Sequence, residues 1–178
     1  GIQEGHVLLK PAIDTSTSRC FLPNLSSNDI GDFVRPGGHG TRVAGAVLYG
    51  ENISVDGKPN LPFWIQNARV LDEYNTMPIE LFSPAAIRAA VEYFHNGKRS
   101  TRIFNHSINA RGSCRLRYMS AWAAEIDVLS HKYDVLIVQS VGNLPESSPT
   151  PLPGILEHIN AARDYPSYLF EASSRVAN

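Results

Sequence analysis

The hydrophobic residues after position 60 follow two alternating patterns. Short apolar runs rich in β-branched residues lie at 64–71, 102–108 and 134–141, and their length predicts strands. Between them, segments 83–94 and 118–132 repeat apolar residues at the spacing of an amphipathic helix. Because strands and helices alternate, we expect parallel βαβ units. The predicted fold class is α/β, with three layers in which a mostly parallel sheet carries helices on both faces.

A further helix is predicted upstream of these strands. An apolar face ended by Gly50 predicts a helix over 41–48, and Ser83 with Pro84 is expected to form the N-cap and first turn of the helix at 83–94. Residues 14–38 are rich in polar residues and glycine, which predicts loops. The apolar faces of the three helices are expected to consist of Val43, Ala44 and Val47; of Ile87, Ala90, Val91 and Phe94; and of Met119, Trp122, Ala123, Ile126 and Leu129.

Composition narrows the function classes. The 178 residues suit one domain, and a net charge of −1 offers no electrostatic attraction to nucleic acid or to an anionic membrane. No apolar run reaches the roughly 18 residues of a membrane helix. Cys20 and Cys114 lie far apart and form neither a zinc-ligand cluster nor a disulfide framework, so we expect free thiols. We therefore expect no cofactor, metal, nucleic-acid partner or membrane partner, with the localisation open between cytoplasm and secretion.

The densest chemical signal is a histidine surrounded by glycines. Gly37, Gly38 and Gly40 flank His39 at the start of the predicted helix, and glycines permit a tight bend and a close approach of another backbone. A histidine held in this way can exchange a proton near neutral pH. The alternative is a histidine that only caps the helix.

A second signal lies where the strand over 134–141 ends. Ligands bind open parallel sheets beyond the carboxyl ends of the strands. Asn143 follows Gly142 at such an end, and its amide N–H could stabilise a developing oxyanion. The alternative is a turn asparagine, which is common after strands. The two signals together are more informative than either one alone.

Four segments of the chain resemble the motifs of the subtilisin-like serine peptidases. Residues 39–45 (HGTRVAG) resemble the histidine motif of that family, and residues 138–143 (VQSVGN) resemble the strand that ends in the oxyanion-hole asparagine. Residues 105–109 (NHSIN) resemble the strand that lines the first substrate pocket, usually Asn, an apolar residue, Ser, an apolar residue and Gly. Residues 1–6 (GIQEGH) resemble the end of the aspartate motif. These segments follow the chain order of the family.

This resemblance implies that residues 1–178 are a single, incomplete subtilisin-like peptidase domain. The catalytic aspartate would precede Gly1 by two positions, the nucleophilic serine would follow Asn178, and His39 would be the general base and acid. Asn143 would donate to the oxyanion. The substrate would be a peptide or protein cleaved through an acyl-enzyme, whereas the incomplete domain is expected to be inactive alone and to self-associate through uncovered apolar surface. The implied walls of the first pocket are Ser107, Ile108, Asn109, Ser140, Val141 and Gly142.

Several residues depart from the family pattern. Arg42 stands where the best-known secreted members have histidine, and Asn109 replaces the glycine that ends the pocket-lining strand. A Cβ at Asn109 could narrow the groove in which substrate pairs as an added strand. Val141 is bulkier than the usual alanine, which favours a smaller first pocket. These departures concern specificity more than chemistry.

Alternative assignments of the chemistry are weaker. Asp14 could be the catalytic aspartate, but its motif has serine in place of glycine and a proline interrupts the strand before it. Cys114 with His106 or His131 could form a thiol nucleophile and base, but no companion motif supports it. A metal site of His6, Asp14 and His39 matches no zinc spacing. A non-catalytic peptide-binding or scaffolding module on the same fold is the second hypothesis, and the sequences flanking the chain would discriminate between the two.

Overall fold

The computed structural model describes residues 1–50, 61, 63–109, 117–141 and 160, and all statements below concern these residues. A single 3₁₀ turn at Lys10–Ala12 precedes the first strand. In chain order the strands and α-helices are β1 (Arg19–Cys20), α1 (His39–Tyr49), β2 (Ala68–Arg69), α2 (Ser83–His95), β3 (Ile103–His106), α3 (Ala121–Tyr133) and β4 (Leu136–Gln139).

The three helices occupy the predicted segments, and local residues explain their ends. α1 begins after Gly38, whose φ is 90°, and ends at Gly50, whose φ is 57°, so both ends use a backbone conformation that favours glycine. In α3 the hydroxyl of Ser120 accepts a hydrogen bond from the Ala123 N–H at 3.1 Å, which caps the helix. The expected N-cap at Ser83 is wrong: Ser83 is the first residue of α2, and Phe82 precedes it without a side-chain cap.

The predicted apolar faces are confirmed in α2 and are partly wrong elsewhere. Ile87, Val91 and Phe94 of α2 are buried, as their spacing predicts, and Ala90 is half-buried. In α1 the buried residue of the last turn is Leu48, whereas Val47 is 43% exposed. Met119 is 63% exposed because α3 begins two residues after it.

The strands are parallel but short, and they form two sheets. β3 pairs with β4 over four register positions, from Ile103 opposite Leu136 to His106 opposite Gln139. β1 pairs with β2 over only two positions, and an isolated bridge joins Ile13 to Ile65. The expectation of parallel βαβ units is therefore confirmed for β3, α3 and β4.

The expectation of one continuous sheet is wrong for the described residues. β2 is much shorter than the predicted strand at 64–71, and β1 lies in a stretch that we expected to be loop. Near the boundary between the two sheets, the side chains of Gln66 and Thr101 are hydrogen-bonded to each other. A bond between side chains does not extend a backbone ladder, which needs paired N–H and C=O groups. The described strands thus form two separate two-stranded sheets.

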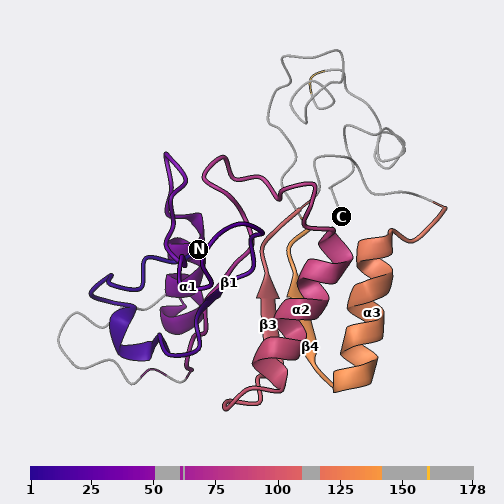
Figure 1. The fold of residues 1–178 in the computed structure, drawn as a ribbon. Helices are drawn as coiled ribbons and strands as arrows, with labels where there is room; N and C mark the ends of the chain where they lie inside the picture. Colours follow the sequence, from indigo (N-terminus) through magenta and orange to yellow (C-terminus); the bar gives the residue numbers. More distant parts are fainter. Residues whose placement is uncertain (51–60, 62, 110–116, 142–159, 161–178) are drawn as a thin grey trace.

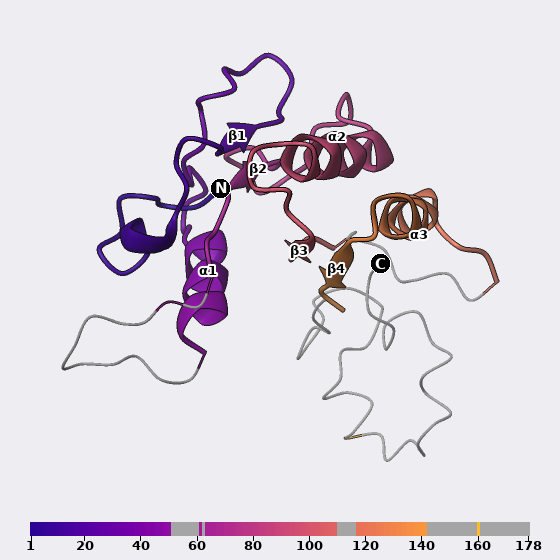
Figure 2. The same ribbon diagram turned by 90° about the horizontal axis from the view of Figure 1, so that it is seen from below.

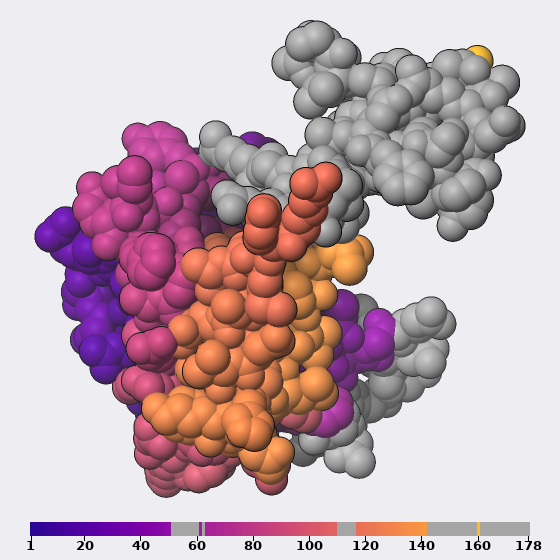
Figure 3. Space-filling view, turned by 90° about the vertical axis from the view of Figure 1, so that its right-hand side faces the viewer, coloured from indigo at the N-terminus to yellow at the C-terminus, as the bar shows by residue number. Residues whose placement is uncertain are grey.

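The helices lie on two sides of the strands. Figure 2 shows α2 and α3 on one side of the row of strands and α1 on the other. α3 forms much of the surface on its own side of the molecule, with α2 beside it (Figure 3). None of the described helices is long and apolar enough to span a bilayer. The thiol of Cys20 is buried and free, and Cys114 lies outside the described residues.

Two hydrophobic clusters correspond to the two sides. The first packs α1 against the 3₁₀ turn and the residues that follow it, and its buried members are Leu9, Ala12, Ile13, Ala44 and Leu48. The second packs α2 and α3 against the sheet of β3 and β4, and its buried members are Ile87, Val91, Leu129 and Val135.

Candidate functional site

The ends of β3 and β4 bring together most of the described residues expected to line the first pocket. The Ser140 N–H donates to the His106 carbonyl at 3.0 Å, which continues the ladder by one bond past the strands. The Asn109 amide donates to the Ser140 hydroxyl at 3.2 Å. Segments 107–109 and 140–141 therefore lie side by side, as the topology of neighbouring parallel strands predicts. Gly142 and Asn143 lie outside the described residues.

His39 is the first residue of α1, and a carboxylate shapes the loop before it. The Asp32 side chain accepts hydrogen bonds from the backbone N–H groups of Val34 at 3.2 Å and Gly38 at 2.5 Å. Gly38 adopts the left-handed conformation directly before the helix. The His39 side chain is exposed, and among the described residues its ring makes no hydrogen bond or ion pair. Its two nitrogens are thus open to groups from elsewhere.

The first residues of the chain lie against the first turn of α1. A Cβ added to Gly40 would lie 2.4 Å from the Gly1 carbonyl oxygen, so only glycine permits this approach. The Gln3 N–H donates to the Thr41 hydroxyl at 3.0 Å, and the Gln3 side chain donates to the Asp32 carbonyl at 2.8 Å. Backbone contact and hydrogen bonds together hold this segment beside the residue that follows His39.

The first turn of α1 and the carboxyl ends of the strands lie toward the same side of the molecule. In Figure 1 the N-terminus, which contacts Gly40, lies beside the upper part of α1, and the arrow of β3 points upward. Among the described residues, no hydrogen bond or ion pair joins His39 to segments 107–109 or 140–141. His39 and the two strand-end segments thus lie toward the same side of the molecule, without a hydrogen bond or ion pair that joins them among the described residues.

Other residues that the sequence singled out have structural partners. The Asp14 carboxylate accepts hydrogen bonds from the Ser16 hydroxyl and from Arg99, both at 2.6 Å, and these bonds lower its pKa. Arg42 donates to the Gly37 carbonyl at 3.3 Å and so fastens the loop before His39. Among the described residues, no group of His, Cys, Asp or Glu could hold a metal ion, which argues against a site of His6, Asp14 and His39.

Sequence reasoning missed a polar pair behind the strand ends. The ring Nδ1 of His106 lies 2.5 Å from the Gln139 Oε1, and the His106 ring packs edge-on against Trp122 with centroids 5.0 Å apart. Burial lowers the pKa of His106, and the hydrogen bond with Gln139 opposes part of that shift. Two polar residues at the ends of adjoining apolar strands were the signal in the sequence that could have indicated this pair.

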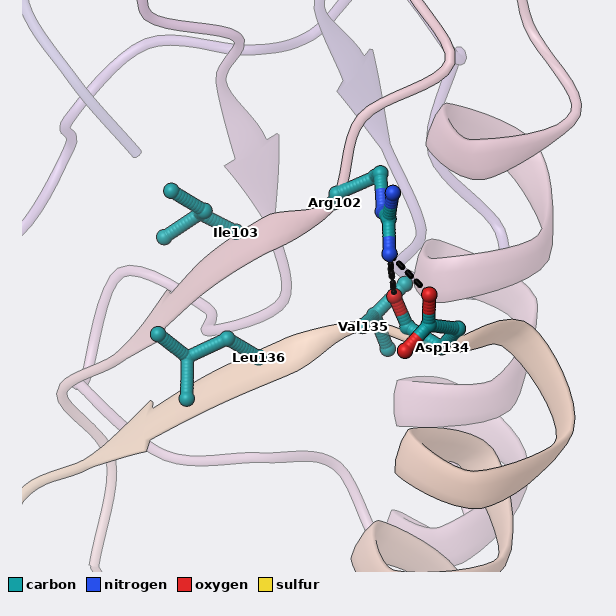
Figure 4. Close-up of a pocket in the computed structure, with 5 residues that line it drawn as sticks. All are labelled: Arg102, Ile103, Asp134, Val135 and Leu136. Carbon is teal, nitrogen blue, oxygen red and sulfur yellow. Dashed lines mark hydrogen bonds and ion pairs between the residues drawn. The ribbon is translucent and has the colours of Figure 1, made fainter.

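A shallow cavity lies at the opposite ends of β3 and β4. Its volume is about 410 Å³, and its walls include the exposed ion pair of Arg102 with Asp134 (Figure 4). The side chains of Ile103 and Leu136 point away from the helices, and they are 61% and 59% exposed. This open apolar face is the kind of surface through which the expected self-association could occur, and that association stays a prediction.

Comparison with protein families gives one result that covers most of the chain. The model of the subtilase family matches residues 1–157, which include the histidine segment and both strand-end segments. Neither the curated proteins nor the solved structures give a match. The matched length exceeds half of the chain, so the resemblance expected from the motifs is confirmed: the chain belongs to the subtilase family.

Proposed function

We propose that the protein is the central part of a serine endopeptidase of the subtilisin type, which hydrolyses peptide bonds in peptides or proteins. Membership of the subtilase family supports a serine peptidase lineage. In the proposed reaction a serine oxygen attacks the peptide carbonyl while His39 takes its proton, and His39 then returns the proton to the leaving amine. Water hydrolyses the resulting acyl-enzyme by the same proton transfers in the second half of the reaction.

The contact between Gly1 and Gly40 carries the proposal. If Gly1 is the glycine of the aspartate motif, the aspartate precedes it by two positions in the longer protein. Two residues span at most about 7 Å, so that carboxylate would be delivered near the first turn of α1. His39 opens that turn and has both ring nitrogens open among the described residues. A carboxylate there would fix the tautomer and orientation of the ring.

The strand ends supply the proposed substrate groove. Segments 107–109 and 140–141 lie side by side, and one residue, Gly142, separates Val141 from the proposed oxyanion donor Asn143 in the sequence. A peptide that pairs with the segment after β3 as an added strand would place its side chain between these two segments. Val141 is 70% exposed and Asn109 carries a Cβ where the family has glycine, so we propose a narrow first pocket.

The first test measures peptide hydrolysis by this chain and by a form extended at both ends to the whole peptidase domain. We expect activity only in the extended form, and we expect His39→Ala to remove it by about a million-fold, as loss of the histidine does in subtilisin. His131→Ala is the matched control because His131 is an exposed histidine on α3. Peptide binding without hydrolysis in the extended form would favour the non-catalytic module instead.

A second test addresses the contact that carries the proposal. Gly40→Ala in the extended form places a methyl group against the Gly1 carbonyl, whereas a Cβ at Gly45 meets nothing within 4 Å. Both glycines lie in α1, and because Gly45 is in the helix interior, Gly45→Ala controls for any gain in helix propensity. We expect Gly40→Ala to lower kcat/KM at least tenfold and Gly45→Ala to leave it unchanged. Equal kcat/KM values for the two variants would contradict the proposed geometry.

A further inference from the structure

The side chain of Gln139 contacts both walls of the proposed groove at once. Its amide nitrogen donates to the Ile108 carbonyl at 3.0 Å and to the Ser140 carbonyl at 2.9 Å. Ile108 belongs to the segment after β3, and Ser140 belongs to the segment after β4. A single amide group therefore joins the two segments that the proposed function places around the first substrate side chain.

The orientation of this amide is determined by its partners. Carbonyl oxygens only accept hydrogen bonds, so the nitrogen of Gln139 must face Ile108 and Ser140, and its oxygen must face His106. The His106 Nδ1 then carries the proton and donates to that oxygen at 2.5 Å. The His106 ring is itself held by its edge contact with Trp122. Trp122, His106 and Gln139 form a chain of contacts that ends at the groove.

His106 departs from the family pattern of the pocket-lining strand. The pocket-lining strand of the family has an apolar residue between Asn and Ser, and His106 stands at that position here. The pair of His106 and Gln139 crosses between β3 and β4 at their last register position. A bond that crosses between strands at their ends can set the distance between the segments that follow them.

We propose that Gln139 is a positioning residue that sets the spacing of the two walls of the first substrate pocket, and that His106 orients its amide. This inference rests on the proposed function, because the walls bind substrate only if the chain is a peptidase. Gln139 acts through the backbone at Ile108 and Ser140 and does not touch the reacting atoms. Its loss changes how peptides fit the groove more than it changes the proton transfers at His39.

The test compares two substrates in the extended protein. A peptide substrate fills the groove, whereas a small acetate ester requires the catalytic groups but not the pocket walls. We expect Gln139→Met, which keeps the size of the side chain and removes its hydrogen bonds, to raise the KM for the peptide. The ratio of peptide to ester kcat/KM should fall about tenfold. An unchanged ratio would overturn the positioning role.

Matched variants separate positioning from general weakening of the fold. Gln66→Met removes another glutamine that joins two segments, through its bonds with Thr17 and Thr101, and it lies before β2, outside the sheet of β3 and β4. We expect this variant to leave the ratio unchanged. His106→Asn keeps a donor close to the place of Nδ1 and should retain most of the wild-type ratio, whereas His106→Leu should behave like Gln139→Met. Equal ratios for His106→Asn and His106→Leu would contradict the orienting role of His106.

Amide hydrogen exchange, which needs no catalysis, distinguishes the positioning role of Gln139 from the proposed peptidase function. The Ser140 N–H is bonded to the His106 carbonyl, so its hydrogen exchange reports on the closure of the two strand ends. We expect Gln139→Met to speed this exchange at least tenfold and Gln66→Met to leave it unchanged. If the wild-type protein hydrolyses neither substrate, the proposed function fails, and fast exchange in Gln139→Met still supports the link between the walls. Unchanged exchange would overturn the link itself.

Discussion

The two small sheets of the molecule are held by different kinds of interaction. β3 and β4 pack beneath α2 and α3, and the side chains at the centre of that contact, Val91 and Leu129, are each 1% exposed. Around β1 and β2 the buried residues include polar ones, with Asn67 1% and Arg69 3% exposed. The region of β3 and β4 is therefore stabilised by apolar packing between helices and strands, and the region of β1 and β2 is stabilised partly by polar side chains.

The polar side chains of the second region bond to a loop. Arg69 pairs with the Asp29 carboxylate at 3.0 Å and donates to the Asp29 carbonyl at 2.9 Å. The Asn67 amide donates to the Ile30 carbonyl and to the Glu4 carboxylate, both at 3.0 Å. Segments far apart in sequence are joined in this way without long strands. This difference teaches that side-chain bonds can join distant segments of the chain where backbone ladders are short.

Removing apolar volume from the region of β3 and β4 should have the largest effect on stability. Leu129→Ala opens a cavity at a fully buried position between two helices and the sheet. We expect the free energy of unfolding to fall by about 3 kcal/mol. Urea denaturation measures this change. Val128→Ala on the same helix is the control, because Val128 is 52% exposed and its loss should change stability by no more than about 0.5 kcal/mol. Equal losses would contradict the assigned core.

The contribution of the buried Arg69 near β2 to stability can be compared with that of the exposed Arg102 near β3. Arg69→Met leaves the Asp29 carboxylate without its partner, and we expect a loss of about 2 kcal/mol, because Asp29 is 34% exposed and regains part of its hydration. Arg102 pairs with Asp134, but their side chains are 60% and 89% exposed. Arg102→Met should therefore cost less than about 1 kcal/mol in the same urea measurement. A larger loss of unfolding free energy for Arg102→Met than for Arg69→Met would contradict the expected difference between the two regions.

These two regions also differ in how far the sequence predicts them. The spacing of Ile87, Val91 and Phe94 identifies a buried helix face, because one face of a regular helix packs against one sheet. β1 has only two residues, which is too short for a periodic pattern to mark it. Its place depends on backbone bonds with the distant segment of β2, from the Arg19 N–H to the Asn67 carbonyl at 2.9 Å and from the Phe21 N–H to the Arg69 carbonyl at 2.8 Å, which is a tertiary effect that hydrophobic patterns do not record.

The sequence also predicts some parts of the candidate site and not others. The meeting of segments 107–109 and 140–141 follows from topology, since neighbouring parallel strands end at the same edge. The approach of Gly1 to Gly40 depends on backbone contact between residues distant in sequence; the glycines around His39 indicated that a backbone could approach there, but not which one. The link from His106 through Gln139 was missed, because it depends on side-chain geometry that two separate strand patterns do not contain.

The smallest expected effect concerns the one buried acid at the contact of α2 with α3. Glu125 is 8% exposed and receives two hydrogen bonds from Arg88, both at 2.7 Å. These bonds hold the pKa of Glu125 below its ordinary value of 4.5. The pair is a polar link inside the region otherwise closed by apolar packing, so it tests whether that region also depends on charge.

A lowered pKa in the folded state gives this pair a defined pH dependence. Above about pH 5 the carboxylate is charged in both states and the pair contributes its full stability. As the pH falls below 4.5, the unfolded chain binds a proton before the folded chain does, and the contribution disappears as the pH passes the folded pKa. Glu125→Gln lacks this titration.

We expect urea denaturation to give a higher free energy of unfolding for the wild type than for Glu125→Gln at pH 6. This difference should become smaller toward pH 3. Asp14 also has a lowered pKa, but it is present in both proteins and its effect cancels in the difference. A gap that stays constant with pH would show that Glu125 contributes through packing alone, and the contact of α2 with α3 would then be apolar in its energetics as well as in its composition.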